Sequence, residues 1–161
     1  MNILVIRSTS IQHLALVVQS LKKEFPQADI EILTHEHSVS SVKAIKEISS
    51  VLPYPFSRDF SPFALPSRVE KDYPVVVVPA SNISGSGFEN VLLLALRMSK
   101  GKVVLCDKNG ILKNFPKHEI IQRTLLFILL IPLASLSSVI LTLFALLMMA
   151  VTTRFKKDRE T

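Results

Sequence analysis

Apolar runs and amphipathic segments alternate along the first two thirds of the chain. Residues 2–7 (NILVIR) have the continuous apolar character of a strand buried on both faces of a parallel sheet. Residues 11–25 carry apolar side chains three and four positions apart, which predicts an amphipathic helix, and Pro26 ends it. The same order of strand and helix recurs at 28–33 and 40–48.

The pattern continues through the middle of the chain. Residues 51–56 (VLPYPF) predict a strand at the edge of a sheet, because two prolines rule out a central position. The elements predicted after it are a proline-bearing connection with a short helix around 67–71, a central strand at 73–79, a helix at 88–98 and a last strand at 102–106. Strands that alternate with helices form a parallel sheet covered by helices. The predicted fold is therefore α/β, a Rossmann-like parallel sheet flanked by helices over residues 1–112.

The last part of the chain has a different character. Residues 124–153 contain no charged side chain, and their length exceeds the roughly 20 residues that a helix needs to cross a bilayer. A basic juxtamembrane linker at 113–123 precedes them and a basic tail at 154–161 follows. We predict a C-terminal transmembrane helix, with a re-entrant hairpin broken near Pro132 as the alternative.

The charge distribution adds to this picture. The chain has a formal net charge of +6, and several of its cations flank the apolar segment. Such cations attract anionic headgroups, so membrane lipid is a predicted partner. The chain starts with a strand pattern rather than the basic and apolar regions of a signal peptide. We therefore expect a cytoplasmic domain anchored to the inner (cytoplasmic) membrane. The sequence lacks Trp and a basic stripe with interleaved aromatics, which argues against nucleic-acid binding.

Two polar segments follow predicted strands and are expected at the same edge of the sheet, where ligands of such sheets bind. The turn after the first strand either caps the next helix or holds a phosphate or sugar phosphate on its backbone N–H groups. The loop 81–87 (SNISGSG) follows the central strand. The candidate ligand-binding residues are Ser8, Thr9, Ser10, Gln12, Ser84, Gly85, Ser86 and Gly87.

Cofactor and metal motifs give no positive prediction. The loop 81–87 lacks the Lys-Ser/Thr ending of a P-loop and the spacing of GxGxxG, so no cofactor is expected. His35 and His37 flank Glu36 without an evident third ligand, so no metal site is expected. Cys106 is the only cysteine, which excludes an intramolecular disulfide.

Three stretches, in this order, carry a resemblance to a known family. They are MNILVIRSTSI with LVVQSLKKEFPQADIEILT, then VLPYPF, then KDYPVVVVPASNISGSGFENVLLLALRMSKGKVVL. Together they resemble the N-terminal half of the heptosyltransferases, glycosyltransferases that add heptose to the lipopolysaccharide core. The likeness covers residues 1–110. It implies one Rossmann-like half of a two-lobed (GT-B) glycosyltransferase.

The chain departs from the family at a functional position. Where the family has Ile-Gly-Asp, this chain has Ile11, Gln12 and His13. The resemblance places His13 at the position of the Asp that acts as general base toward the acceptor hydroxyl. An imidazole can accept that proton, because its unperturbed pKa is about 6.5. His13 is therefore the candidate catalytic residue. Gln12 replaces a glycine that allows close approach of a ligand to the backbone, which indicates a changed pocket.

The resemblance leads to three functional hypotheses. In the family a second half binds the nucleotide-sugar donor, whereas here the apolar segment follows the first half, so we expect no transfer by this chain alone. The first hypothesis is a membrane-anchored, glycosyltransferase-like half-domain that assists glycan or glycolipid assembly. It would present a lipid-linked glycan acceptor or pair with a separate donor-binding glycosyltransferase subunit. The alternatives are a non-enzymatic scaffold subunit of a membrane complex, and a glycosyltransferase that uses His13 as its base.

Overall fold

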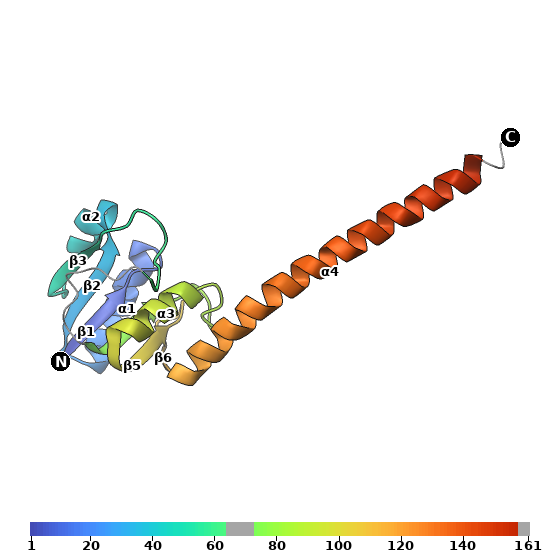
Figure 1. Cartoon of the computed structure of the whole chain (residues 1–161). Helices are drawn as coiled ribbons and strands as arrows, with labels where there is room; N and C mark the ends of the chain where they lie inside the picture. The colour runs from blue at the N-terminus through green and yellow to red at the C-terminus, as the bar shows by residue number, and fades with distance from the viewer. Residues whose placement is uncertain (64–72, 158–161) are drawn as a thin grey trace. The chain divides into compact units, whose positions relative to one another are not determined.

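The computed structural model describes residues 1–63 and 73–157. It divides into two compact units, Met1–Ile121 and Gln122–Thr161. The elements, labelled in Figure 1, are β1 (Asn2–Ile6), α1 (Ile11–Glu24), β2 (Asp29–His35), a 3₁₀ turn η1 (Glu36–Ser38), α2 (Val39–Lys43), β3 (Ser50–Tyr54), β4 (Tyr73–Pro79), α3 (Glu89–Met98), β5 (Ser99–Cys106), β6 (Leu112–Phe115) and α4 (Lys117–Lys157). The predicted α/β fold is confirmed.

The first unit is built on one six-stranded sheet in the order β3-β2-β1-β4-β5-β6. Strands β1 to β5 are parallel, and β6 pairs antiparallel with β5. Strand β3 lies at the edge, as predicted from Pro53 within it and Pro55 directly after it. The short helix predicted around 67–71 lies outside the described residues.

Two hydrophobic clusters lie on opposite faces of this sheet. Ile3 and Val5 of β1 pack with buried residues of α1, while Leu4 and Ile6 pack with α3. This division follows from the strand geometry, because successive side chains of a strand point to opposite faces. Ile120, in the first turn of α4, is buried in the cluster of α3. Both faces of the sheet are therefore covered, which explains why its central strands are apolar at almost every position.

The second predicted helix is shorter than the sequence pattern indicates. The prediction of a helix over 40–48 is wrong beyond Lys43, where α2 ends. Glu47 has a φ of 74°, which lies in the left-handed region that an L-residue does not adopt inside an α-helix. The Ser49 N–H donates to the Ile30 carbonyl at 2.7 Å. This bond draws the chain alongside β2 before β3 begins.

Strand β6 was not predicted from the sequence. Asp107 ends β5 and organises the reversal, because its Oδ1 accepts the backbone N–H groups of Asn109 at 2.9 Å and Ile111 at 3.1 Å. Gly110 has a φ of 78°, which glycine adopts without strain. The chain then runs back along β5 and reaches the start of α4 at the amino edge of the sheet. Residues 113–115, predicted to belong to a linker, thus form the end of β6.

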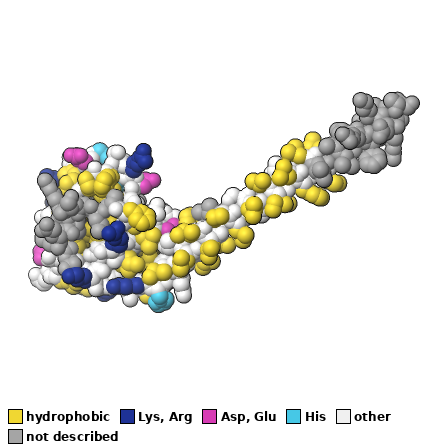
Figure 2. Space-filling view, in the orientation of Figure 1, with side chains coloured by type: hydrophobic (Ala, Val, Ile, Leu, Met, Phe, Trp, Pro, Cys, Tyr) yellow, Lys and Arg dark blue, Asp and Glu magenta, His cyan; other side chains and the backbone are white. Residues whose placement is uncertain are grey.

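Helix α4 is long and apolar enough, by length and composition, to cross a membrane. It begins at Lys117, before the predicted apolar segment, and continues without a break through Pro132. The helix break that a re-entrant hairpin needs is therefore absent from α4. Figure 2 shows hydrophobic side chains along its visible face. Ser137 and Thr142 donate their hydroxyls to carbonyls of the preceding turn, which satisfies these polar groups in an apolar medium.

Candidate functional site

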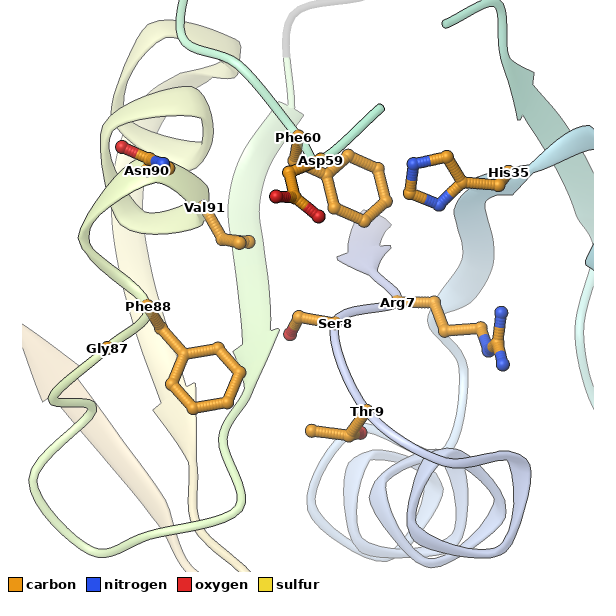
Figure 3. Close-up of a pocket in the computed structure, with 10 residues that line it drawn as sticks. All are labelled: Arg7, Ser8, Thr9, His35, Asp59, Phe60, Gly87, Phe88, Asn90 and Val91. Carbon is orange, nitrogen blue, oxygen red and sulfur yellow. The ribbon is translucent and has the colours of Figure 1, made fainter. Parts of the chain in front are cut away.

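The strand order reverses between β1 and β4, because β1 leads through α1 to β2 on one side and β4 leads through α3 to β5 on the other. Open α/β sheets bind ligands beside such a point, outside the carboxyl ends of the strands. A cavity of about 430 Å³ lies there, and we call it the switch cavity (Figure 3). Its lining residues are Arg7, Ser8, Thr9, His35, Asp59, Phe60, Gly87, Phe88, Asn90 and Val91.

Ser8 and Ser10, in the turn between β1 and α1, both make structural hydrogen bonds. Ser10 caps α1, and its Oγ accepts the N–H of His13 at 3.3 Å. The Ser8 hydroxyl donates to the Pro79 carbonyl at 2.5 Å and so links the ends of β1 and β4. The capping interpretation therefore holds for Ser10. Ser8 holds the two strand ends together, and its oxygen lone pairs remain able to accept a hydrogen bond.

Two buried polar atoms of this turn, unlike the serine hydroxyls, make no hydrogen bond among the described residues. They are Arg7 Nε and Thr9 Oγ1. The Arg7 guanidinium makes a long contact of 3.4 Å from Nη1 to Thr34 Oγ1. A buried polar group without a partner costs about 1–3 kcal/mol. These two groups therefore lower the stability of the fold at the wall of the switch cavity.

His13 lies in a neighbouring cavity rather than in the switch cavity. This second cavity, of about 630 Å³, we call the His13 cavity. Its lining residues are Ser8, Thr9, Ser10, Gln12, His13, Leu16, Ser81 and Lys108. His13 Nε2 is 2.9 Å from the Asp107 carbonyl oxygen. Since a carbonyl only accepts, Nε2 carries the proton, and Nδ1 of the neutral ring is left as an acceptor.

Most of the loop residues predicted to bind a ligand at 81–87 lie outside the two cavities described above. Asn82 organises it, because its Oδ1 accepts the Gly85 N–H at 2.6 Å and its Nδ2 donates to the Ser86 carbonyl at 2.8 Å. Gly85 has a φ of 72° and packs against Leu105. Gly87 lines the switch cavity, whereas Ser84, Gly85 and Ser86 line neither the switch cavity nor the His13 cavity. The structure therefore brings Gly87 together with the turn after β1.

The switch cavity also contains polar residues that the sequence analysis missed. Asp59 comes from the segment after β3, Asn90 from the first turn of α3, and His35 is the last residue of β2. In Figure 3 the Asp59 carboxylate points into the space between Phe60 and Val91. The position of His35 at the carboxyl end of an apolar strand was a usable signal. Asp59 had no such signal, because it lies in an irregular segment.

Cys106 is not suited to act as a nucleophile. It is buried at the end of β5, and burial, together with the neighbouring Asp107 charge, raises the pKa of its thiol to about 12. A reactive cysteine requires a thiolate near neutral pH. Among residues 1–63 and 73–157, no three His, Cys, Asp or Glu side chains lie close enough to hold a metal ion. The chemistry of this edge is therefore that of hydroxyl, carboxylate, imidazole and amide groups, with the cations of Arg7 and Lys108 beside them.

The comparisons with known proteins concern the fold. No family model matches the sequence, and no curated protein matches it. Among solved structures, the chain is similar to ADP-heptose lps heptosyltransferase II from E. coli, with 18% identity and a TM-score of 0.47 over 62% of this chain and 29% of that chain. It is also similar to E. coli heptosyltransferase WaaC with ADP, with 15% identity and a TM-score of 0.42 over 66% of this chain and 35% of that chain.

A second structure of that enzyme, with ADP-2-deoxy-2-fluoro heptose, gives 12% identity and a TM-score of 0.43, and covers 66% of this chain and 36% of that chain. The chain thus spans 29% to 36% of the length of these structures. The class that the fold and the site define is a Rossmann-like domain with an open ligand edge.

Proposed function

We propose that this protein is a membrane-anchored, glycosyltransferase-like half-domain that binds a glycan or glycolipid acceptor at the carboxyl edge of its sheet. The open switch cavity between β1 and β4 carries the proposal. Its polar lining offers hydroxyl, carboxylate and amide groups, which are the groups that hydrogen-bond sugar hydroxyls. The resemblance of residues 1–110 to the N-terminal half of the heptosyltransferases favours lipopolysaccharide-type glycans as the ligand class.

The proposal assigns the activated sugar to a separate donor-binding subunit. Residues 117–157 form α4, so no second sheet follows the first within the described chain. Helix α4 would hold the domain at a bilayer, where lipid-linked acceptors are concentrated. The cations at Lys113, Lys117 and Arg123 would add attraction to anionic headgroups of about 1 kcal/mol each.

The alternative of a purely structural scaffold predicts a carboxyl edge that is filled by its own side chains or buried by a partner, and the cavities argue against the first of these. The switch cavity and the His13 cavity, of about 430 and 630 Å³, favour a ligand-binding edge instead. The third hypothesis, transfer with His13 as base, is supported by one observation. The Asp107 carbonyl orients the ring and leaves Nδ1 as the proton acceptor, which is how a general base is held by a third group.

Purification of the full chain from its native membrane in mild detergent tests the proposal. We expect glycolipid or a glycosyltransferase subunit to co-purify, as identified by mass spectrometry. Asp59→Ala should reduce the recovered glycolipid, because Asp59 lines the switch cavity. Asp29→Ala is the matched control, since it removes the same charge at the amino end of β2. Recovery of neither glycolipid nor transferase from wild-type membranes would contradict the proposal.

A further inference from the structure

A third cavity, similar in size to the switch cavity, shares a lining residue with it. We call it the aromatic cavity, and its volume is about 420 Å³. Its lining residues are His35, Glu36, His37, Tyr54, Pro55, Phe56 and Ser57. His35 lines both cavities. His35, the last residue of β2, is therefore the residue that the two cavities share.

The aromatic cavity has a wall of rings held in place from the core. Tyr54 is 1% exposed, and its hydroxyl accepts the Ser61 N–H at 3.0 Å. The ring centroid of Tyr54 lies 5.4 Å from that of His35 and 4.8 Å from that of Phe60, and the His35 and Phe60 centroids are 4.4 Å apart. These distances are typical of packed aromatic pairs. Figure 3 shows the rings of His35 and Phe60 next to each other.

Two further rings present their surfaces to solvent. Phe56 is 44% exposed and packs edge-on against Tyr54, with centroids 5.4 Å apart. His37 is exposed and stacks on His35, with centroids 5.7 Å apart and 21° between the planes. An exposed, supported aromatic surface costs little conformational entropy when a ligand covers it. Such a surface complements a ligand with an apolar face and a polar rim.

The charge of the lining selects among ligands with that shape. No Lys or Arg lines the aromatic cavity, and Glu36 adds a carboxylate. A carboxylate repels a phosphate, whereas it accepts hydrogen bonds from hydroxyl groups. Ser57 and the imidazoles supply further hydrogen-bonding atoms. This combination fits an uncharged sugar ring and disfavours a nucleotide.

We propose that the aromatic cavity is a second carbohydrate subsite, so that the ligand is an oligosaccharide with one unit in the switch cavity and the next across His35, on Phe56. The inference rests on the proposed function and specifies its ligand: an acceptor of at least two sugar units. A ligand of only one sugar unit, bound in the switch cavity, would leave the rings of Phe56 and His37 uncovered.

The test measures how affinity depends on glycan length. The full chain in nanodiscs is titrated with oligosaccharides of one to four units, released from rough lipopolysaccharide by mild acid and separated by size. Saturation-transfer NMR reports binding. We expect the wild type to bind two or more units about tenfold more tightly than one, which is the effect of one good aromatic contact.

Phe56→Ala should abolish this length preference and leave single-unit binding unchanged. Phe63→Ala is the matched control, because Phe63 is 90% exposed on the same segment and lines neither cavity. A length preference that survives Phe56→Ala, or equal affinity for one and two units in the wild type, overturns the second subsite. Phe56-dependent binding of ADP or UDP overturns the assignment to carbohydrate. Absence of binding at every length, with glycolipid also absent from the purified protein, instead contradicts the proposed function.

Discussion

His13→Ala separates a structural role of this residue from a catalytic one. The substitution removes the hydrogen bond from His13 Nε2 to the Asp107 carbonyl, 2.9 Å long. That carbonyl keeps a second donor, the Gly110 N–H at 2.9 Å, so no orphan acceptor remains. The expected loss is therefore that of one neutral hydrogen bond, about 0.5–1.5 kcal/mol. Lost packing of the half-buried ring brings the total to about 1–2 kcal/mol.

Near-ultraviolet circular dichroism of the full chain in detergent measures this loss. The chain has two Tyr and no Trp, and both tyrosines, Tyr54 and Tyr73, are buried in the first unit. Their signal therefore reports the unfolding of that unit alone. We expect Tm to fall by about 4–8 °C, since 1 kcal/mol corresponds to roughly 4 °C in a domain of this size.

Gln12→Ala, at an exposed position of the same turn, is the control and should leave Tm unchanged. An unchanged Tm in His13→Ala would refute the structural role. Sugar transfer by the transferase subunit that the proposed function expects to co-purify with the full chain gives the second readout. Loss of transfer beyond the fraction unfolded would support His13 as the base. Normal transfer in His13→Ala would exclude it.

Three further substitutions have defined outcomes. Thr9→Val removes a buried hydroxyl without a partner among the described residues and should raise the free energy of unfolding by about 1 kcal/mol, as measured in urea. Tyr73→Phe removes the 2.8 Å bond to the buried Glu31 carboxylate and should cost about 1–3 kcal/mol. Burial, and then Glu31, raise the pKa of Tyr73, so wild-type stability is full below about pH 10 and falls above it. This alkaline loss should be smaller in Tyr73→Phe. Gly101→Ala would place a Cβ 2.1 Å from the Pro74 carbonyl oxygen, and thermal melts should show clear destabilisation.

The elements that sequence reasoning located best are those whose burial is unambiguous. The strand predicted at 73–79 has the bounds of β4. A short, continuous run of β-branched residues bounded by prolines indicates a buried strand. The helix over 40–48 was predicted too long, since apolar spacing at Ile45 and Ile48 persists after the backbone leaves the helix at Lys43. These two side chains pack on the core from a turn, where the spacing of residues does not identify the conformation.

The candidate site was predicted in part for a similar reason. The edge of the sheet follows from strand order, so Ser8, Thr9 and Gly87 were placed at the switch cavity. Asp59 enters it from an irregular segment 52 positions after Arg7, and no local pattern connects the two. Strand β6 was not predicted because only two of its four residues, Leu112 and Phe115, are apolar, which is too few for a strand pattern. Contacts between distant, irregular segments require the folded structure.

The reversal of the chain at β6 places the start of α4 and the cavities at opposite edges of the sheet. Since β6 returns the polypeptide to the amino edge before Lys117, the carboxyl edge carries its cavities without a covalent tether leaving from it. Residues added to or removed from α4 after Ile121, where the first unit ends, would leave His35 and the β1–β4 junction as they are. The length of α4 can therefore change in evolution without a change in the residues that line the cavities.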